Sequence, residues 1–328
     1  MGRPRTGGIG PSLGSVVAAE VRAGRGRTLR DRVLLAPFRA ARADIVHFEF
    51  SGVAVAYQRL LRDLRPARIA VSCRGTNDQI LPFTDPERPA ELAAVFAEVD
   101  LIHCVSDAMR RNVEGLGAPP EKVLVNRPAI PVEEFTPLAA SRTTGQGPLR
   151  LLSVGRLNWV KGYDDALRAI APLVAAGHEV EYRIVGDGDQ REKLSFLIDQ
   201  LGLGGAVQLL GAQTQQEVRD LLVWADAFLL SSLSEGISNA VLEAMASGLA
   251  VVSTDCGGMP EVIDSGTDGI LVGTGDHRAL RAALEALAGD PGLRRRLGVA
   301  AAARAAASFG LDRQIEAFAA AYDGLVAP

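Results

Sequence analysis

Short apolar runs alternate with amphipathic stretches along most of this chain. In its second half the apolar runs predict strands, which fall at 149–154, 181–185, 207–210, 227–230 and 250–253. Stretches with helical spacing lie between them, at 163–176, 190–201, 215–224 and 239–247. Gly177, Gly202 and Gly248 follow three of these helices, and glycine is the residue type that ends helices in a left-handed conformation. The alternation predicts an α/β domain that is doubly wound around a parallel sheet.

The first half shows the same alternation with fewer elements. Strands are predicted at 44–48, 67–72, 101–105 and 123–126, and helices at 55–64, 91–98 and 108–116. Residues 141–148 are polar and rich in turn formers, which is typical of a linker. We therefore expect an N-terminal Rossmann-like domain over 1–140, with 1–43 atypical, and a second domain over 149–310. The alanine-rich tail predicts two helices around Gly310, and we expect the last, 311–328, to pack back toward the first domain.

Composition is that of a globular protein with an uneven charge. The chain has 328 residues, which favours two domains. Residues 1–150 carry 21 Lys and Arg against 16 Asp and Glu, whereas residues 151–328 carry 14 against 23. Nine arginines fall within residues 1–42, which indicates either a solvated basic face or contact with an anionic membrane surface. No apolar run is long enough to span a bilayer, and no signal-peptide pattern is visible.

Cysteine and histidine positions favour no metal site. Cys73, Cys104 and Cys256 are widely separated, so a disulfide framework or a structural zinc site is not expected. His47 and His103 stand in apolar runs, which favours satisfied strand or core histidines over catalytic ones. We expect a cytoplasmic protein that does not bind nucleic acid.

The stretch from Ser231 to Gly248 carries the strongest chemical signal. It places Glu235 in a loop after an apolar strand and Glu243 on the following helix. Ser238 or Asn239 can cap that helix, whose first amides and positive dipole end suit a phosphate. Glu243 lies one turn further along the helix, and a carboxylate accepts two hydrogen bonds side by side, as a vicinal diol requires. The pattern predicts a nucleotide-sugar site.

A second loop offers the complementary charge. Arg156 and Lys161 lie between Gly155 and Gly162, directly after the first strand of the second domain. Two cations in such a loop can converge on a diphosphate, although a solvated loop pair is the simpler alternative. Both loops follow parallel strands, where open α/β sheets bind ligands. Gly186 and Gly188 lack the third glycine of a dinucleotide fingerprint, so a dehydrogenase is disfavoured.

Together these motifs resemble retaining glycosyltransferase family 4, which has the GT-B fold. The resemblance rests on Ser153-Val154-Gly155-Arg156-Leu157 with Lys161-Gly162, on Glu235 and Glu243 separated by seven residues, and on Gly257-Gly258-Met259-Pro260-Glu261-Val262. It is specific over about 149–325 and weaker over 44–137. It implies two Rossmann-like doubly wound domains facing a cleft, with the first one reduced.

The resemblance also implies roles for individual residues. Arg156 and Lys161 would hold the diphosphate and stabilise the departing nucleotide, Glu243 would bind the ribose and Glu235 the donor sugar. The remaining donor-binding residues implied are Gly155, Leu210, Gly211, Gly236, Ile237, Ser238, Asn239 and Ala240. The family transfers sugar with retention of configuration, without a metal ion or other cofactor, and the leaving phosphate accepts the proton. The expected partners are a nucleotide-sugar donor and an acceptor that is a sugar, a lipid-linked glycan or a small molecule.

Two departures from the family pattern keep alternatives open. Arg74 stands where the family has a donor-sugar-contacting histidine, and an arginine cannot act as a base at neutral pH. Residues 1–43 do not supply the expected first strands, although Thr6-Gly7-Gly8-Ile9-Gly10 can be a remnant of a glycine-rich loop. One alternative is therefore a non-catalytic nucleotide-sugar-binding subunit, or a degenerate transferase that needs a partner. Another is an epimerase or phosphorylase of the same fold. The basic N-terminal region is compatible with peripheral contact at the cytosolic membrane face.

Overall fold

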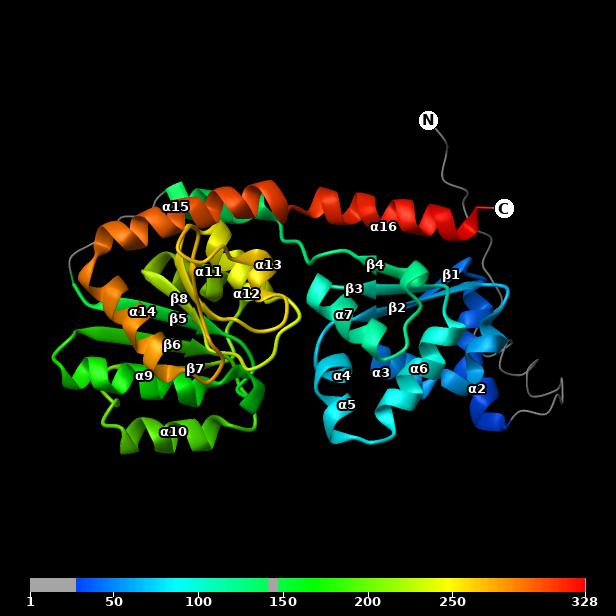
Figure 1. Cartoon of the computed structure of the whole chain (residues 1–328), viewed down its shortest axis with the longest axis horizontal. Helices are drawn as coiled ribbons and strands as arrows, with labels where there is room; N and C mark the ends of the chain where they lie inside the picture. The colour runs from blue at the N-terminus through cyan, green and yellow to red at the C-terminus, as the bar shows by residue number, and fades with distance from the viewer. Residues whose placement is uncertain (1–27, 141–146, 328) are drawn as a thin grey trace. The chain divides into compact units, whose positions relative to one another are not determined.

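The computed structural model describes residues 28–140 and 147–327. The chain divides into two compact units, each described here by itself (Figure 1). Among the described residues, unit 1 contains 28–104, 110–125 and 318–327, and unit 2 contains 105–109, 126–140 and 147–317. The glycine-rich segment at 6–10, most of the basic N-terminal region and the linker core at 141–146 lie outside the described residues.

Unit 1 is built on a parallel sheet whose strands lie side by side in chain order. Its described strands are β1 (Ile45–Phe48), β2 (Arg68–Cys73), β3 (Leu101–Cys104) and β4 (Val123–Val125). The register places Ser72 opposite His103 and Cys73 opposite Cys104. The strands predicted from the apolar runs are therefore present, with ends shifted by one or two residues.

Helices cover this sheet, and one predicted helix is wrong. The helical elements that begin before β4 are α2 (Leu29–Ala41), α3 (Ser51–Ala56), η1 (Gln58–Leu64), α4 (Thr76–Gln79), α5 (Leu81–Thr84), α6 (Arg88–Glu98), α7 (Asp107–Gly115) and η2 (Pro120–Lys122). The segment predicted as one helix at 55–64 is instead a short α-helix followed by a 3₁₀ segment. Leu60, Leu61 and Leu64 are buried in that segment, and Leu61 and Leu64 are three residues apart, which is one turn of a 3₁₀-helix.

Unit 2 contains a six-stranded parallel sheet with the order β10-β9-β8-β5-β6-β7. The strands are β5 (Leu149–Val154), β6 (Val180–Val185), β7 (Val207–Gly211), β8 (Ala227–Leu230), β9 (Ala250–Thr254) and β10 (Ile270–Val272). This is the order of a doubly wound nucleotide-binding fold, in which the first and fourth strands are neighbours. The strand order therefore reverses between β5 and β8, and ligands bind such folds at the carboxyl ends of those two strands.

Each face of this sheet has its own apolar core. Leu229 belongs to one core, while its neighbours Phe228 and Leu230 belong to the other, as alternation along a strand requires. The helical elements of this part of the chain are α8 (Val132–Ala140), η3 (Trp159–Lys161), α9 (Tyr163–Ala175), α10 (Arg191–Gln200), α11 (Gln215–Trp224), α12 (Asn239–Ala246), α13 (Met259–Val262), α14 (His277–Gly289), α15 (Pro291–Ser308) and α16 (Leu311–Val326). The first core involves α9, α10 and α14, and the second involves α8, α11, α12 and α15.

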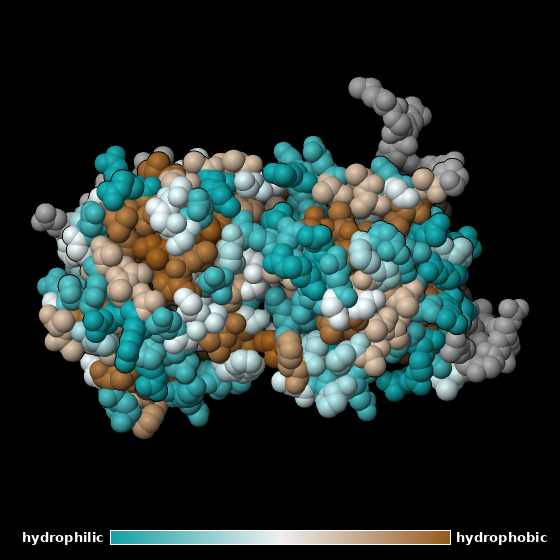
Figure 2. All heavy atoms as spheres, in the orientation of Figure 1, coloured by the Kyte–Doolittle hydropathy of each residue, from teal (hydrophilic) through white to brown (hydrophobic). Residues whose placement is uncertain are grey.

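The last two helices meet at Phe309 and Gly310, as the alanine-rich tail predicts. Residues 318–326 of α16 and Ala327, which follows the helix, cluster with unit 1. Hydrophilic residues cover most of the surface drawn in Figure 2, and apolar residues appear there in separate patches. Over the described ranges, none of the helices is both long and apolar enough to cross a membrane.

Candidate functional site

Lys161 and Glu235 meet at the point where the strand order of unit 2 reverses. Lys161 ends the short η3 segment after β5, and Glu235 lies in the loop after β8. The Lys161 Nζ atom lies 2.5 Å from Glu235 Oε1, and the Ser232 hydroxyl donates to the same oxygen at 2.7 Å. Both charged side chains are largely enclosed, with exposed fractions of 19% and 12%. A cation and a carboxylate are thus held together where this fold binds ligands.

The backbone around this pair is tightly fitted. Gly162 has φ of +58°, and a Cβ there would lie 2.1 Å from the carbonyl oxygen of Ser231. The Ser231 hydroxyl donates to the Lys161 carbonyl at 2.9 Å, and the Leu233 amide donates to the Val160 carbonyl at 2.7 Å. Only glycine permits this approach without strain. The two loops are therefore fixed against each other, which fixes the ion pair.

The other predicted residues of the first loop are Gly155 and Arg156. The Gly155 amide donates to the Val185 carbonyl at 2.9 Å, and a Cβ at Gly155 would lie 3.2 Å from Lys161 Cε. The aliphatic part of Lys161 thus passes over Gly155. Arg156 is exposed, so its guanidinium is accessible to an anionic ligand.

Leu210 and Gly211 end β7, two strands away from β5. The Gly186 amide donates to the Gly211 carbonyl at 2.9 Å, and the Gln213 side chain donates to the Leu210 carbonyl at 3.0 Å. Both residues are partly buried. They lie at the same edge of the sheet as Lys161. Within the described residues of unit 2, no hydrogen bond or ion pair joins them to Lys161.

Helix α12 supplies the other predicted donor-binding residues. Gly236 and Ile237 are buried in the loop before it, while Asn239 is exposed and Ala240 partly buried. Ser238 occupies the N-cap position, yet its hydroxyl makes no capping hydrogen bond with the helix amides. The side-chain cap expected from Ser238 or Asn239 is therefore wrong. Gly248, with φ of +72°, ends the helix as predicted.

Glu243 lies on α12 with a different charged neighbour from Glu235. It is partly buried, and burial raises the pKa of its carboxyl while the charge of Arg219 on α11 lowers it. Arg219 itself forms an ion pair with Glu134 and lies 5.7 Å from the ring of Phe135. The structure thus places Glu243 beside α11, one helical turn beyond the N-terminus of α12.

Three residues without a predicted role complete the surroundings of the Lys161–Glu235 pair. Besides Ser232, these are Thr254, whose hydroxyl donates to the Ser232 carbonyl at 2.5 Å, and Cys256, whose Sγ lies 3.6 Å from Thr254 Oγ1. Burial raises the pKa of the Cys256 thiol to about 11, so it is protonated at neutral pH. In the sequence, Ser232, Thr254 and Cys256 follow closely after predicted apolar strands, and this position is the signal that could have identified them as site residues. In the described ranges, no group of three or more His, Cys, Asp or Glu side chains is placed to hold a metal ion.

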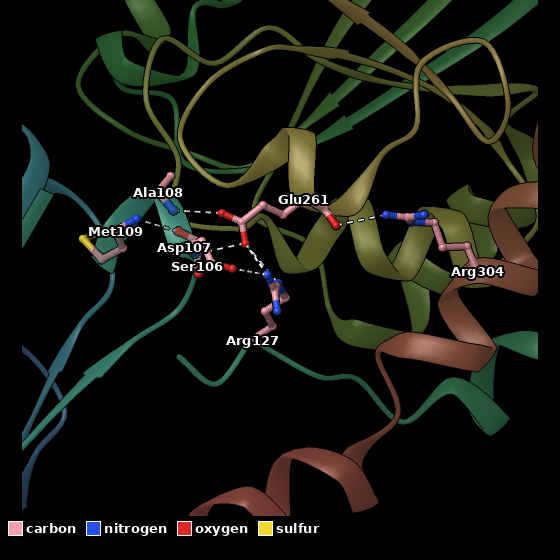
Figure 3. Close-up of polar contacts among 7 residues, drawn as sticks. All are labelled: Ser106, Asp107, Ala108, Met109, Arg127, Glu261 and Arg304. Carbon is pink, nitrogen blue, oxygen red and sulfur yellow. Dashed lines mark hydrogen bonds and ion pairs between the residues drawn. The ribbon is translucent and has the colours of Figure 1, made fainter. Parts of the chain in front are cut away.

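Glu261 is the acidic residue of the Gly-Gly-Met-Pro-Glu motif, and its carboxylate binds other residues of unit 2 (Figure 3). Its carboxylate accepts from the amides of Asp107 and Ala108 at 3.0 and 2.8 Å, and from Arg127 Nη2 at 2.6 Å. Arg127 also pairs with Asp107 at 2.6 Å. The Glu261 carboxylate therefore lies at the N-terminus of α7, where a negative charge is favourable.

Gly258 makes this arrangement sterically possible. A Cβ at position 258 would lie 2.3 Å from the Gly236 carbonyl oxygen and 2.7 Å from Ser106 Cβ. The Gly258 amide donates to that same carbonyl at 2.8 Å. The motif thus joins the loop that carries Glu235 to the start of α7.

Arg74 belongs to unit 1, where it follows β2. Its guanidinium forms an ion pair with Glu49 at 2.7 Å, and its amide donates to Asp78 Oδ2 at 3.0 Å. Asp78 is 2% exposed, and burial raises the pKa of its carboxyl. The buried Asp78 carboxylate therefore holds the backbone of the loop that carries Arg74, while the guanidinium remains accessible.

The two histidines of unit 1 lie in a hydrogen-bonded row, as satisfied histidines would. His47 Nδ1 lies 2.6 Å from Tyr322 Oη, and His47 Nε2 lies 2.9 Å from Ser72 Oγ. Ser72 Oγ in turn lies 2.8 Å from His103 Nδ1. The row joins β1, β2 and β3 to the end of α16.

Comparison with known protein sequences identifies one family. Residues 138–304, about half of the chain, match the family described as "Glycosyl transferases group 1". The chain is 36% identical over 249 residues to a putative colanic acid biosynthesis glycosyltransferase, WcaL, of Salmonella typhimurium, covering 73% of this chain and 60% of the relative. It is 35% identical over 254 residues to the amylovoran biosynthesis glycosyltransferase AmsK of Erwinia amylovora, covering 76% and 61%. The chain thus spans about three fifths of the length of these curated relatives.

Solved structures share the fold at low sequence identity. Sucrose-phosphate synthase from Thermosynechococcus elongatus superposes with a TM-score of 0.79 at 18% identity, over 90% of this chain and 77% of that one. HepE of Anabaena in complex with UDP gives a TM-score of 0.73 at 19% identity, over 96% and 85%. These neighbours establish the GT-B fold expected from the sequence.

Proposed function

Because this chain belongs to the glycosyl transferases of group 1, we propose that it moves a sugar from a nucleotide diphosphate sugar to an acceptor. The observation that carries the proposal is the Lys161–Glu235 pair, held at 2.5 Å where the strand order of unit 2 reverses. An ammonium there can bind a diphosphate, and a carboxylate beside it can accept hydrogen bonds from sugar hydroxyls. A nucleotide-sugar contains both groups next to each other.

In this proposal Lys161 and Arg156 stabilise the charge that develops on the leaving nucleotide. The bond between the anomeric carbon and the diphosphate oxygen breaks, and the acceptor hydroxyl oxygen forms the new bond from the same face, so configuration is retained. The acceptor proton passes to the departing phosphate oxygen. Lys161, held by Glu235, and the accessible Arg156 supply electrostatic stabilisation at the departing oxygen, so the reaction does not depend on a metal ion or other cofactor.

The rest of the donor extends along the sheet edge. Backbone amides at the start of α12 add to the diphosphate contacts, as helix N-termini commonly do. Glu243 binds the ribose diol, and Leu210 with Gly211 lies near the base. Arg74 contacts the donor sugar or a phosphate as a hydrogen-bond donor.

The acceptor is proposed by chemical class. WcaL and AmsK are named for the biosynthesis of colanic acid and amylovoran, which supports a glycan acceptor, free or lipid-linked. A lipid-linked acceptor would place the protein in the cytoplasm at the membrane face, with the nine arginines of residues 1–42 available for anionic lipid.

A second candidate is a nucleotide-sugar-binding subunit without transfer activity of its own. Arg74 favours it, because an arginine stands where the resembled family has histidine.

The test is an assay of purified protein with a panel of UDP-, GDP- and ADP-sugars and p-nitrophenyl glycoside acceptors, with and without EDTA. We expect transfer or slow donor hydrolysis that EDTA does not abolish, with an anomeric configuration in the product, read by NMR, that matches the donor. Donor binding without turnover would favour the binding subunit. Inverted configuration would overturn the retaining mechanism.

A further inference from the structure

A cavity of about 560 Å³ lies in unit 1 at the amino ends of β1 and β2. The residues before those strands, including Asp44 and Arg65, line it together with the end of α2. Parallel α/β folds bind substrates at the carboxyl ends of their strands, so the proposed transfer reaction does not use this cavity. Its volume falls within the range of sites for small molecules.

The cavity has an apolar lining that packing holds in place. Phe38 of α2, Val46 of β1 and Leu64 of η1 belong to it, and Val46 and Leu64 are buried. The centroid of the Phe38 ring lies 5.6 Å from that of Tyr57 and 6.2 Å from that of Phe48. These contacts fix the ring before a ligand arrives, which lowers the entropic cost of binding. An apolar group that enters the cavity is removed from water against this lining, which favours binding.

The cavity also has one positive and one negative side chain that the fold leaves unpaired. Among the described residues, the exposed side chains of Arg42 and Asp44 take part in no hydrogen bond or ion pair. The remaining charged residues of the lining have partners, and these are Arg39, Asp63 and Arg65. A ligand in the cavity therefore meets one guanidinium and one carboxylate that are available to it.

Arg42 keeps its position at a cost in backbone energy. It caps α2 with φ of +47° and is the one non-glycine residue with positive φ in the part of the chain that the structure describes. Glycine is favoured at such a helix end, because a Cβ is strained there. Residues in sparsely populated conformations cluster at sites that bind ligands. An arginine in this conformation therefore favours a role for its side chain.

We propose that the cavity binds an apolar α-amino acid, with its carboxylate at Arg42 and its ammonium at Asp44. A guanidinium binds a carboxylate through two parallel hydrogen bonds, and a carboxylate accepts from an ammonium. The side chain of the amino acid lies against the apolar lining. An anion without an ammonium would meet Asp44 uncompensated, and a cation without a carboxylate would meet Arg42, so the two residues select a zwitterion. The site goes beyond the proposed transfer reaction and is independent of it.

Calorimetric titration of the full chain with leucine, phenylalanine and tryptophan tests the site. We expect at least one of them to bind, and glycine, which lacks the apolar group, to bind at least tenfold more weakly. The N-acetyl derivative of the bound amino acid lacks the ammonium, and its amide lacks the carboxylate. Because each loses a charged hydrogen bond, both derivatives should bind about ten- to a hundredfold more weakly.

Variants of the two charged residues complete the test. Arg42→Gly removes the guanidinium and places glycine in a conformation that favours it, so its Tm without ligand should be no lower than that of the wild type. Its Kd for the amino acid should rise about ten- to a hundredfold, and the Kd of Asp44→Asn should rise as well. Arg59→Ala is the matched control, because Arg59 is an exposed arginine of η1 outside the cavity lining, and it should bind like the wild type.

Absence of binding by the wild type to all three apolar amino acids would overturn the site. Equal affinity of Arg42→Gly and the wild type would overturn it too, as would equal affinity of the wild type for the amino acid and its N-acetyl derivative. Because none of these titrations contains a nucleotide, their outcome does not depend on the proposed donor site.

Discussion

Lys161 has two partners in the proposed reaction, and the structure shows one of them. Its ammonium contacts Glu235, whose carboxylate also accepts from Ser232. A diphosphate arriving at Lys161 therefore meets a cation whose charge is partly compensated. Glu235 opposes diphosphate binding by charge repulsion, while it offers the sugar an acceptor of hydrogen bonds.

Glu235→Gln separates these two effects. Removing the carboxylate charge should tighten the binding of a nucleotide diphosphate without its sugar, on the order of three- to tenfold in Kd. Transfer should fall by about tenfold or more, because the donor sugar loses its charged acceptor. Calorimetry with the nucleotide and an assay of transfer measure the two quantities. Weaker nucleotide binding in this variant would contradict the arrangement.

The sequence predicted the residue types of this site better than their contacts. Lys161 and Glu235 could both be assigned to the carboxyl ends of strands, because a parallel sheet gathers those ends at one edge. Their direct pairing joins residues 74 positions apart, and no local pattern encodes it. Ser232 and Cys256 acquire their place only from the packing of neighbouring loops, and the missing Ser238 cap likewise depends on the loop before α12.

Among the elements, the short helix α13 stabilises the start of α7, a role that its sequence motif does not reveal. It directs Glu261 into the first turn of α7, where two amides and Arg127 share one carboxylate. The Glu261 side chain is 16% exposed, so these donors depend on it for their hydrogen bonds.

Glu261→Ala should therefore destabilise the protein. Leaving buried donors without their acceptor costs about 1–3 kcal/mol, which corresponds to a decrease in Tm of about 3 to 10 °C. Glu261→Gln retains an acceptor oxygen and should lose less. The control is Glu285→Ala, which removes an exposed ion pair with Arg281 on α14 and should change Tm little. Thermal denaturation gives all four values, and a Tm for Glu261→Ala equal to that of the control would contradict this task.

The end of α16 is held to the sheet of unit 1 through His47. Burial lowers the pKa of His47 below its ordinary value of 6.5. The nearby charges have smaller effects on this pKa: Glu49 raises it and Arg74 lowers it. The row continues through Tyr322, Ser72 and His103. The folded protein therefore favours neutral His47 more than the unfolded chain does.

This shift gives a pH dependence with a defined sign. Because the folded pKa is the lower one, the stabilisation is complete above about pH 6.5 and is lost as the pH falls through the folded pKa. The Tm of the wild type should fall more steeply between pH 7 and pH 5 than that of His47→Gln. His178→Gln, at an exposed histidine, should follow the wild type. Parallel curves for the wild type and His47→Gln would show that His47 does not titrate with folding.

Element prediction succeeded where the hydrophobic pattern has one period and failed where two patterns overlap. Five of the six strands of unit 2, β5 to β9, contain apolar runs because both faces of the sheet are buried, and the pattern predicts them within one residue; the three-residue strand β10 (Ile270–Val272) was not predicted. The segment at 55–64 was assigned to one helix, although α3 ends at Ala56 and a 3₁₀ segment follows. Helix α8 (Val132–Ala140) was not predicted either.

At the scale of the whole molecule, the chain belongs to the family of group 1 glycosyl transferases, and unit 2 contains a six-stranded doubly wound sheet. The six parallel strands and both cores belong to that unit. All of the proposed donor-binding residues except Arg74 lie there too. The proposed function therefore requires that unit 2 bind a nucleotide diphosphate through Lys161.

Calorimetric titration of UDP, GDP and ADP into the wild type, Lys161→Met and Lys193→Met tests this most directly. Lys193 is the matched control, because it is also a lysine of unit 2 in an ion pair, with Asp164 at 3.5 Å, but is 56% exposed on α10. We predict that one nucleotide binds the wild type and Lys193→Met equally. For Lys161→Met, loss of a charged hydrogen bond of about 1.5–3 kcal/mol should weaken binding by about ten- to a hundredfold. Equal affinity of Lys161→Met and the wild type would contradict the donor site.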